Sequence, residues 1–263
     1  MIYVCIPSHN EAATVGLLLW KIRQVFAGFP REYQLLVLDD GSTDATSEIL
    51  EPYSRVLPLT LVHHAERQGY AASVRTLFRT AIELTDRPKR DAAILMHADF
   101  THNPQVIPDL VRRIESGADL VVAEGKLEGE PSRPHRMLRR FAPQLLRGTV
   151  VVPGVHDVVS GFAILRLVAL RNAMRSHGNG FLVTDGWAAN AELYWRTGRY
   201  ARRVESVPSV ERHDLRQRPS RLRPAEEAIN LWRARSTLRA TPIAPPAEPV
   251  GRDHERHTEA VSR

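Results

Sequence analysis

The feature that most constrains the fold of this 263-residue chain is an alternation between short β-branched runs and longer segments of helical period. Five apolar runs are typical of strands, at residues 2–6, 34–39, 59–63, 92–97 and 119–124. Between them, apolar side chains return every three or four residues, first at Val15, Leu18, Leu19, Ile22 and Phe26, and again within 70–82 and 107–114. Strands that alternate with helices in this way predict an α/β fold with a mainly parallel sheet, of the doubly wound nucleotide-binding kind.

The net charge of the chain indicates which kinds of partner are favoured. The chain carries 36 Lys and Arg against 30 Asp and Glu, a net charge of +6. This balance favours anionic partners such as nucleotides, phosphates or an anionic membrane surface, although a solvated basic surface explains it equally well. The basic residues lack interleaved aromatics and any groove-reading motif, so we expect no nucleic-acid partner.

A single cysteine, Cys5, excludes an internal disulfide and a multi-cysteine metal site. This usage is typical of a reducing compartment. No apolar run approaches the ~18 residues needed to cross a bilayer, and the first strand begins at residue 2. We therefore expect a cytoplasmic protein, with peripheral contact at the inner face of the membrane as the closest approach to lipid.

The domain organisation follows from composition. Residues 1–240 carry the strand and helix patterns and are predicted to form one domain. Residues 241–263 contain four prolines and no aromatic residue, so we expect a disordered tail.

Three predicted strands run into polar loops, namely IPSHNE (6–11), LDDGSTDAT (38–46) and MHADFTHNP (96–104). Ligands of open α/β sheets bind at the carboxyl ends of the strands, so these loops should wall one crevice. There, Asp39 and Asp40 suit a ribose hydroxyl or a base N–H. The same stretch also fits a plain turn before a capped helix.

The third loop offers ligands for a metal ion. His97 supplies an imidazole nitrogen and Asp99 a carboxylate oxygen, and both can reach one divalent cation that bridges a diphosphate. An isolated His-x-Asp pair is also compatible with an ordinary polar loop.

Five motifs taken in order resemble family 2 glycosyltransferases, and more narrowly the branch of dolichyl-phosphate mannose synthases and polyprenyl-phosphate glycosyltransferases. They are IPSHNE (6–11), VLDDGSTDAT (37–46), ILMHADFTHNP (94–104), DVVSGFAILR (157–166) and AELYWRTGRYARRVESVP (191–208). The resemblance covers about residues 1–223. It implies a GT-A fold, a UDP- or GDP-linked sugar donor, a divalent metal and inversion at the anomeric carbon.

The resemblance also assigns roles to matching positions. Asp99 matches the last aspartate of the family's metal motif, which makes it a metal ligand and a catalytic residue, with His97 as the second ligand. Ser160 and Gly161 match a motif near the acceptor phosphate. The nucleotide-sugar positions are Pro7, Ser8, Asn10, Glu11, Asp39 and Asp40, with Arg212, Arg216 and Ser220 in a late basic loop that is similar to one closing over the phosphates.

Two departures from the family pattern alter these expectations. The family has aspartate where this chain has His97, and imidazole suits Mn²⁺ better than Mg²⁺, so we predict that Mn²⁺ is favoured. The family has arginine where this chain has Ala163, which weakens the case for a phosphate acceptor. Arg136, Arg139 or Arg140 can supply the missing charge; we take Arg136 and Arg140 as acceptor-binding candidates, against the alternative of a solvated helix face.

The acceptor remains open between two classes. A polyprenyl phosphate is already an anion and needs no general base, whereas a hydroxyl acceptor does. Asp185 is the candidate base, and a helix cap is an equal explanation for it. A catalytically silent nucleotide-sugar binder is the third alternative, because of His97 and Ala163.

A late segment has the spacing of an amphipathic helix. Ala225, Ala228, Ile229 and Trp232 fall on one face, with arginines around them. An interfacial membrane helix has this arrangement, and so does a helix packed on its own domain. We favour packing.

Overall fold

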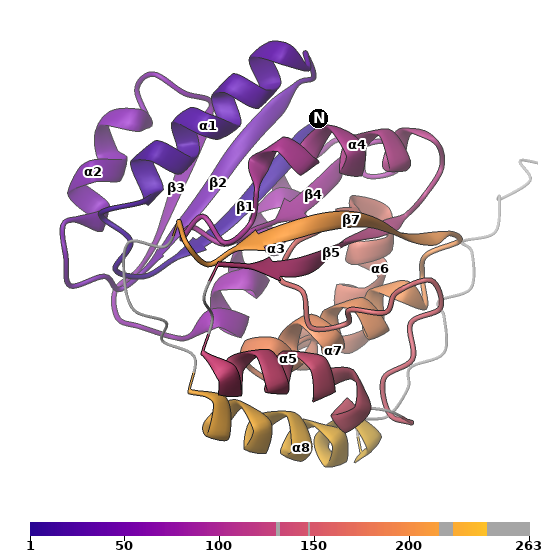
Figure 1. Ribbon diagram of the computed structural model, residues 1–263. Coiled ribbons are helices and arrows are strands. Elements are labelled where there is room, and N and C mark those ends of the chain that lie inside the picture. The colour runs from indigo at the N-terminus through magenta and orange to yellow at the C-terminus, as the bar shows by residue number, and fades with distance from the viewer. Residues whose placement is uncertain (130–131, 147, 216–222, 241–263) are drawn as a thin grey trace, which may run out of the picture.

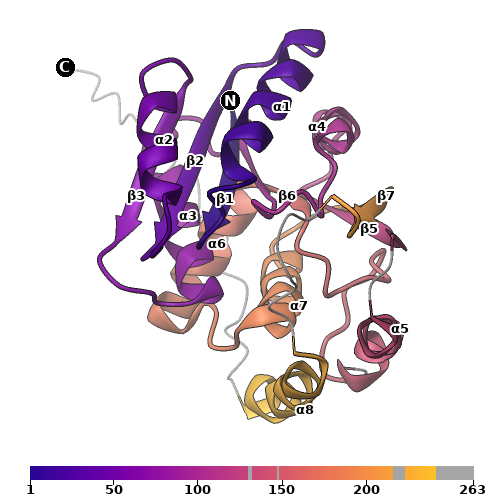
Figure 2. The same ribbon diagram turned by 60° about the vertical axis from the view of Figure 1, so that its left-hand side comes forward.

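The computed structural model describes residues 1–129, 132–146, 148–215 and 223–240. Within these ranges, seven strands form one sheet in the order β3-β2-β1-β4-β6-β5-β7, with helices on both faces (Figures 1 and 2). The strands are β1 (Ile2–Ser8), β2 (Tyr33–Asp40), β3 (Leu59–His64), β4 (Ala92–Leu95), β5 (Leu120–Glu128), β6 (Ala163–Arg166) and β7 (Val204–Arg212).

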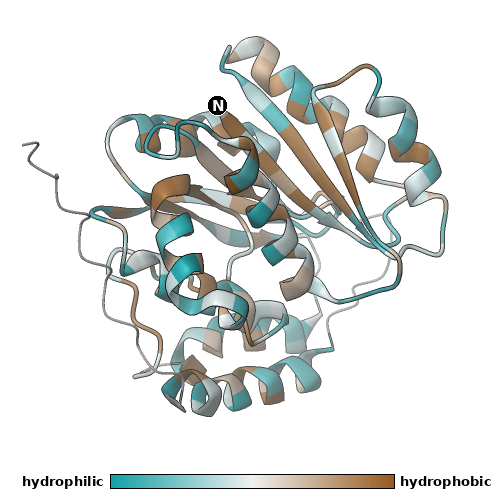
Figure 3. Ribbon diagram, turned by 180° about the vertical axis from the view of Figure 1, so that it is seen from behind, coloured by the Kyte–Doolittle hydropathy of each residue, from teal (hydrophilic) through white to brown (hydrophobic). Residues whose placement is uncertain are grey.

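The helices enclose two apolar cores, one on each face of the sheet. One core takes its helical side chains mainly from α1, α2 and α4, and the other from α3, α5, α6, α7 and α8. In Figure 3 the hydrophobic colour is concentrated on the central strands between these layers. The helices are α1 (Val15–Gly28), α2 (Thr46–Tyr53), α3 (Tyr70–Leu84), α4 (Ile107–Glu115), α5 (Arg133–Leu146), α6 (Leu167–His177), α7 (Gly186–Gly198) and α8 (Pro224–Ala240), with 3₁₀ turns at Pro104–Val106 and Gly178–Gly180.

The predicted α/β architecture is confirmed. β1 pairs in parallel with both β2 and β4, and β2 pairs in parallel with β3. Every residue of the stripe predicted on α1 is buried. The five predicted strands are present, each within a few residues of its expected bounds.

Two strands were not expected from the sequence. β6 has only four residues and runs antiparallel between β4 and β5, so it is too short to carry a pattern of its own. β7 contains Pro208, which argues against a central strand. A proline is tolerated here because β7 is the last strand of the sheet and pairs only with β5.

The register brings the polar loops together. Ser8, the last residue of β1, lies opposite Asp39 of β2, and Cys5 lies opposite Leu95 of β4. Counting onward from Leu95, the segment that contains His97 and Asp99 leaves β4 level with the end of β1. The carboxyl ends of three neighbouring strands therefore share one edge of the sheet, as expected.

Helix α8 packs on the domain, but not through the predicted face. Leu231, Ala234 and Leu238 are buried in the core shared with α5 and α7, whereas Ile229 and Trp232 are 49% and 65% exposed. Apolar residues occur around much of this helix, so the sequence allows more than one buried face. Ala228 and Leu231 lie in line with Ala234 and Leu238 on the face that packs, and Ile229 does not. The expected tail, 241–263, lies outside the described residues, and in the described ranges no helix is both long and apolar enough to span a membrane.

A buried ion pair fixes the antiparallel strand. Arg166, at the end of β6, donates to Asp119 at 2.7 Å and to the carbonyls of Ile114 and Ala118 at 2.6 and 2.8 Å. Burial alone would raise the pKa of Asp119, but hydrogen bonds from Arg202 and Arg166 hold that pKa below its ordinary value. The pair therefore joins β6 to the turn between α4 and β5.

Replacing Arg166 should be costly because it leaves a buried carboxylate with less compensation. We expect Arg166→Met to lower the free energy of unfolding by ~3 kcal/mol in urea denaturation. Arg112→Met is the matched control, since the pair of Arg112 with Asp109 is exposed on both sides and should contribute less than ~1 kcal/mol. Equal losses in the two variants would contradict this account.

Candidate active site

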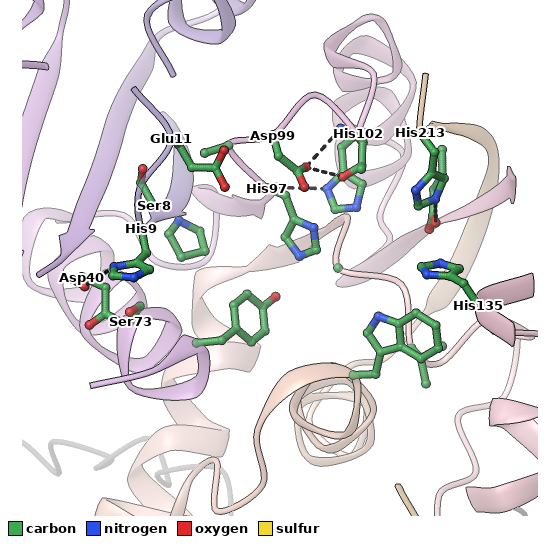
Figure 4. A pocket seen from close by; sticks show the side chains of 18 of the residues that line it. Ser8, His9, Glu11, Asp40, Ser73, His97, Asp99, His102, His135 and His213 are labelled. Carbon is green, nitrogen blue, oxygen red and sulfur yellow. Dashed lines mark hydrogen bonds and ion pairs between the residues drawn. The ribbon is translucent and has the colours of Figure 1, made fainter. Parts of the chain in front are cut away.

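A cleft of about 270 Å³ opens where the carboxyl ends of β1, β2 and β4 meet (Figure 4). One side is formed by the three polar loops and by the segment between β3 and α3. The opposite side is formed by residues of α5, α7 and β7. The cleft thus has a sheet-edge half, which contains the predicted donor residues, and a far half that the sequence did not define.

The first loop places most of its predicted residues on the cleft. Pro7, Ser8 and Glu11 line it, and Ser8 and Glu11 are buried. In the described part of the chain, no group hydrogen-bonds to the buried Oγ of Ser8, so this hydroxyl is suited to meet a ligand. Asn10 is different, because its side chain accepts a hydrogen bond from the backbone N–H of Thr43 at 2.7 Å and so joins the first loop to the second.

Asp39 and Asp40, at the start of the second loop, have different hydrogen-bond partners. Asp40 lines the cleft and accepts from the backbone N–H groups of Gln68 and Gly69 at 2.8 and 2.9 Å and from His64 at 2.7 Å. Burial acts to raise the pKa of Asp40, yet these hydrogen bonds lower it, so the carboxylate is ionised. Asp39 instead accepts from the serines of its own turn and of α2, Ser42 and Ser47.

Asp40 thereby holds a cleft residue that sequence reasoning missed. The backbone of Arg67 packs against Gly41, where a Cβ would lie only 2.6 Å from the Arg67 nitrogen. Gly41 also has a φ of +58°, which favours glycine. Because the turn and the segment before α3 are locked together, Arg67 is positioned at the cleft.

The metal-motif loop is buried and conformationally strained. Asp99 is 4% exposed and accepts from the Thr101 hydroxyl at 2.6 Å. The next residue, Phe100, has a φ of 62°; in the described ranges, only Phe100 and Asn10 combine a side chain with a positive φ. Strained residues of this kind are typical of functional loops, and both lie in loops at this cleft.

His97 is held in a column of rings. It stacks on His102 at 4.3 Å between ring centroids and meets the edge of Tyr70 at 5.7 Å, while His102 stacks on Phe162. Burial, with the neighbouring His97, lowers the pKa of His102 to about 3, so that ring is neutral. Figure 4 shows His97 and Asp99 side by side above the cleft.

Gly161 makes room for that column. A Cβ at position 161 would lie 2.9 Å from Cε1 of His97 and closer still to Nε2. The sequence placed Gly161 near an acceptor phosphate; the structure puts it on the cleft and against the metal-motif histidine. Ser160, its neighbour, is buried and donates to the carbonyl of Ala123 at 2.8 Å, which is a structural contact.

His97 and Asp99 offer too few ligands to hold a metal ion by themselves. Within the residues that the structure describes, no group of three or more His, Cys, Asp or Glu side chains is arranged to hold one. Asp99 and His97 therefore fit a divalent cation only if a bound diphosphate supplies further oxygen ligands, as nucleotide phosphates usually do for Mg²⁺. The chemistry of the pair is compatible with such a shared site.

The far half of the cleft is organised by Arg139. This buried guanidinium pairs with Asp157 at 2.6 Å and with Glu211, and it lies 5.3 Å from the ring of Trp187. Burial raises the pKa of Asp157 to about 6; for Glu211 the effect of burial is outweighed by Arg139 and His213, which lower its pKa to about 2. This end of the cleft therefore holds a cation that is already paired with two carboxylates.

The two arginines expected to bind the acceptor lie on the solvent side of α5. Arg136 and Arg140 are exposed, whereas Arg139 is buried and lines the cleft. The helix turns about 100° per residue, and Arg139 lies on the buried face with His135 and Ala142, whereas Arg136 and Arg140 lie on the exposed face. Of the three arginines that could supply the missing charge, only Arg139 therefore lines the cleft, and the acceptor role of Arg136 and Arg140 stays a prediction.

Two further predicted residues, Asp185 and Arg212, do not line the cleft in the described part of the chain. Asp185 accepts from the backbone N–H of Ala71 at 2.8 Å, so it caps α3 rather than the helix that follows it, and it is absent from the described cleft lining. Arg212 pairs with Asp214 at 2.6 Å and is likewise absent from that lining. Arg216 and Ser220 lie outside the described residues.

Three cleft residues, Trp187, His135 and Glu211, had no predicted role, whereas His213 belongs to the late basic segment that the sequence connects with the phosphates. Trp187, His135 and Glu211 reach the cleft from α7, α5 and β7, and His213 directly follows β7. The helical phase of α5 was the one available signal, because His135, Leu138, Arg139 and Ala142 follow helical spacing.

The fold places the chain among known proteins. The mainly parallel sheet flanked by helices is shared with solved glycosyltransferases of the GT-A type. Glucosyl-3-phosphoglycerate synthase from Mycobacterium tuberculosis, solved with UDP, matches with a TM-score of 0.60 at 18% identity, over 93% of this chain and 82% of that one. S. aureus TarS 1-349, solved with UDP-GlcNAc, matches with a TM-score of 0.59 at 14% identity, over 90% and 66%. These likenesses confirm the predicted GT-A fold.

The chain belongs to glycosyl transferase family 2, whose model matches residues 3–173. Dolichol-phosphate mannosyltransferase of Pyrococcus furiosus is 27% identical over 168 residues, which are 62% of this chain but only 45% of that protein. Polyprenol monophosphomannose synthase of Mycolicibacterium smegmatis is 24% identical over 211 residues, covering 78% of this chain and 75% of that one. The resemblance seen in the motifs is confirmed at the level of the family.

The contact between Gly161 and His97 can be tested by a double-mutant cycle. We expect Gly161→Ala to lower the free energy of unfolding by ~1–3 kcal/mol, because the new methyl group displaces the imidazole. In a His97→Ala background the cost should largely disappear, because the two positions are coupled. Gly28→Ala is the control, since a Cβ there has no neighbour within 4 Å. Additive effects of the two substitutions in urea denaturation would refute the contact.

Proposed function

We propose that this protein is an inverting, metal-dependent glycosyltransferase that moves a sugar from a UDP- or GDP-linked donor to a polyprenyl phosphate. The observation that carries the proposal is the meeting of three polar loops, with Asp99 and His97, in one cleft at the carboxyl edge of the sheet. Relatives named for lipid-phosphate acceptors support the acceptor class. Solved relatives with UDP-sugars support the donor class.

The sheet-edge half of the cleft is the proposed donor site. The buried hydroxyl of Ser8 is a hydrogen-bonding group for the ribose or base, and the ionised Asp40 lies beside it. Arg67 contributes a guanidinium group, which can form bidentate hydrogen bonds with phosphate oxygens. The diphosphate is therefore proposed to lie between Arg67 and Asp99.

Asp99, with His97 beside it, would hold a divalent cation against the diphosphate oxygens. When bound, such a cation neutralises the negative charge that develops on the leaving nucleoside diphosphate. The protein fixes Asp99 through Thr101 and seats His97 between His102 and Tyr70. A solved relative contains Mn²⁺ with UDP-glucose, which supports a metal of this kind.

The far half of the cleft is the proposed acceptor site, with Arg139 as the anion ligand. A polyprenyl phosphate is an anion near neutral pH, so its oxygen attacks the anomeric carbon without a general base. The new carbon–oxygen bond forms on the face opposite the departing diphosphate, and the anomeric carbon is inverted. We propose that this occurs in the cytoplasm, with peripheral contact at the inner face of the membrane that holds the lipid.

A hydroxyl acceptor is the second candidate. It is favoured by the charge around Arg139, because the guanidinium already faces two carboxylates and Glu211 is ionised. A hydroxyl group requires a base. Asp185, the base expected from the sequence, would first have to release the backbone N–H of Ala71.

The experiment that tests the proposed function combines binding with turnover. A thermal-shift panel of UDP, GDP and their sugars, with and without Mn²⁺, should give a selective stabilisation by one nucleotide family, because a ligand that binds the folded state raises its stability. Incubation of the preferred donor with polyprenyl phosphate should then yield the glycosylated lipid. Binding without turnover on either acceptor class would identify a silent binder, and the absence of any nucleotide shift would overturn the proposal.

Metal preference depends on residue 97. We expect higher turnover with Mn²⁺ than with Mg²⁺, since imidazole is a poor ligand for Mg²⁺. His97→Asp should raise the ratio of the Mg²⁺ rate to the Mn²⁺ rate by roughly tenfold, because it supplies the oxygen that Mg²⁺ prefers. A ratio of rates that is the same in both enzymes, measured by release of nucleoside diphosphate, would show that His97 is not a ligand.

The acceptor assignment predicts different effects for neighbouring arginines. With a short-chain, water-soluble polyprenyl phosphate, we expect Arg139→Lys to raise the acceptor KM by about tenfold or more, because it loses a charge-assisted hydrogen bond. Arg136→Lys, exposed on the same helix, should leave the KM within about twofold. A larger effect at Arg136 than at Arg139, in steady-state kinetics at saturating donor, would restore the original assignment.

A further inference from the structure

We propose that Asp157 is a positioning residue for the acceptor, which takes up a proton when a phosphate binds Arg139 and thereby releases that guanidinium to the incoming anion. The inference rests on the proposed function, because it explains how an arginine that is already paired can bind an acceptor phosphate. Asp157 lies between α5 and β6 and does not line the cleft in the described part of the chain. It therefore acts on the acceptor through Arg139.

Two carboxylates meet on a single nitrogen of Arg139. Its Nη2 donates to Oδ2 of Asp157 at 2.6 Å and also to Oε1 of Glu211. Acceptors that share one nitrogen lie close together, and each of two like charges at such a separation disfavours the ionised form of the other. The side chains of Asp157 and Glu211 are only 18% and 12% exposed, so water screens this repulsion poorly. The geometry favours a state in which one of the two carboxyl groups carries a proton.

The neighbours of each carboxyl group indicate which one takes the proton. Glu211 has a second basic group beside it, because Nε2 of His213 lies 3.7 Å from its Oε2. Burial acts to raise the pKa of Glu211, but Arg139 and His213 lower it to about 2. Asp157 has another carboxylate beside it instead, since Glu124 accepts from its backbone N–H at 3.3 Å. Burial raises the pKa of Asp157 to about 6, and Glu211 and Glu124 act in the same direction, against Arg139. Asp157 is therefore the group closer to protonation at neutral pH.

The other titratable side chains at this end of the cleft leave that balance unchanged. Tyr194 of α7 is fully buried, and burial raises the pKa of its phenol, so it is neutral. Burial lowers the pKa of His102 to about 3, so this ring is neutral as well. His135 packs its ring against the imidazole beside the other carboxylate, with 4.9 Å between the centroids. Among the described residues that act most strongly on Asp157, Arg139 is the cation.

An incoming phosphate requires a change in this charge balance. A phosphate monoester carries about −1.5 to −2 charges near neutral pH, and Arg139 is already paired with two carboxylates. If Asp157 takes up a proton from solvent, its negative charge is removed, and Nη2 of Arg139 can donate to a phosphate oxygen in its place. Glu211 stays ionised and keeps the guanidinium at the cleft, which both residues line. No covalent bond other than the new O–H forms or breaks.

The expected pH dependence has a definite sign. A phosphate beside Arg139 raises the pKa of Asp157 further, so the complex binds more protons than the free protein does. The contribution of Asp157 to acceptor affinity is therefore fully present below about pH 6. It is lost as the pH rises through the pKa of the complex, by up to about tenfold per pH unit.

Isothermal titration calorimetry tests the proton uptake. A short-chain, water-soluble polyprenyl phosphate is titrated into the protein at about pH 7 in two buffers of different ionisation enthalpy, and the difference in heat gives the number of protons taken up. Wild-type protein should take up close to one proton per phosphate bound, and Asp157→Asn should take up none. At about pH 8 the affinity of Asp157→Asn should exceed that of wild type by roughly tenfold.

Asp109→Asn is the matched control, because Asp109 is an exposed carboxylate of α4 that also pairs with an arginine. Its proton count and affinity should equal those of wild type. The titration of the phosphate itself, whose second pKa is about 6, is the same for all three proteins, so their differences isolate Asp157. The wild-type proton count needs no variant, so the test survives poor folding of Asp157→Asn.

The outcomes separate this inference from the proposed function. Phosphate binding with an equal proton count in wild type and Asp157→Asn would overturn the inference and leave the proposed function standing. Proton uptake that depends on Asp157, without formation of glycosylated lipid, would support the inference and overturn the proposed acceptor. Absence of phosphate binding to wild type would overturn the inference, and the turnover assay on both acceptor classes would then decide the function separately.

Discussion

The structure depends on the register in which β1 lies between β2 and β4. Parallel pairing places Ser8 opposite Asp39 and Cys5 opposite Leu95, so that three chain segments emerge from the sheet at the same level. A shift of one residue in either pairing would turn the alternate side chains to the other face, and both faces are packed with apolar cores. Burial therefore fixes the register, and the register fixes the cleft.

Hydrogen bonds between side chains and backbone hold these loops together on one side of the cleft. Asn10 accepts from Thr43, and Asp40 accepts from the backbone of Gln68 and Gly69, so hydrogen bonds join the first loop, the second loop and the segment before α3. The far wall uses the same device across greater sequence distances. Asp185 accepts from the first turn of α3, and Glu227 of α8 accepts from the first turn of α7. The start of each of these two helices is therefore held by a carboxylate from another part of the chain.

The sequence predicts the sheet-edge half of this site much better than the far half. Strand ends and motifs are local, so the positions of Ser8, Asp40 and Asp99 follow from the pattern alone. The short strand β6 and the edge strand β7 lack such a pattern. The position of Glu211, which β7 brings to the cleft, could therefore not be predicted from the sequence. Arg139 could have been chosen over Arg136 and Arg140 from the helical phase, because it shares spacing with the apolar residues of α5. The trans cap by Asp185 and the seat of His97 on Gly161 depend on tertiary contacts that no local pattern encodes.

The central claim is that a divalent cation joins the carboxylate of Asp99 to the diphosphate of a nucleotide bound at the sheet edge. Anomalous diffraction from crystals soaked with Mn²⁺ and the preferred nucleoside diphosphate tests this directly. The account predicts one anomalous peak in contact with the Asp99 carboxylate and with the diphosphate oxygens, in the cleft bounded by Ser8 and Arg67. A nucleotide bound elsewhere, or a manganese ion held without Asp99, would contradict it.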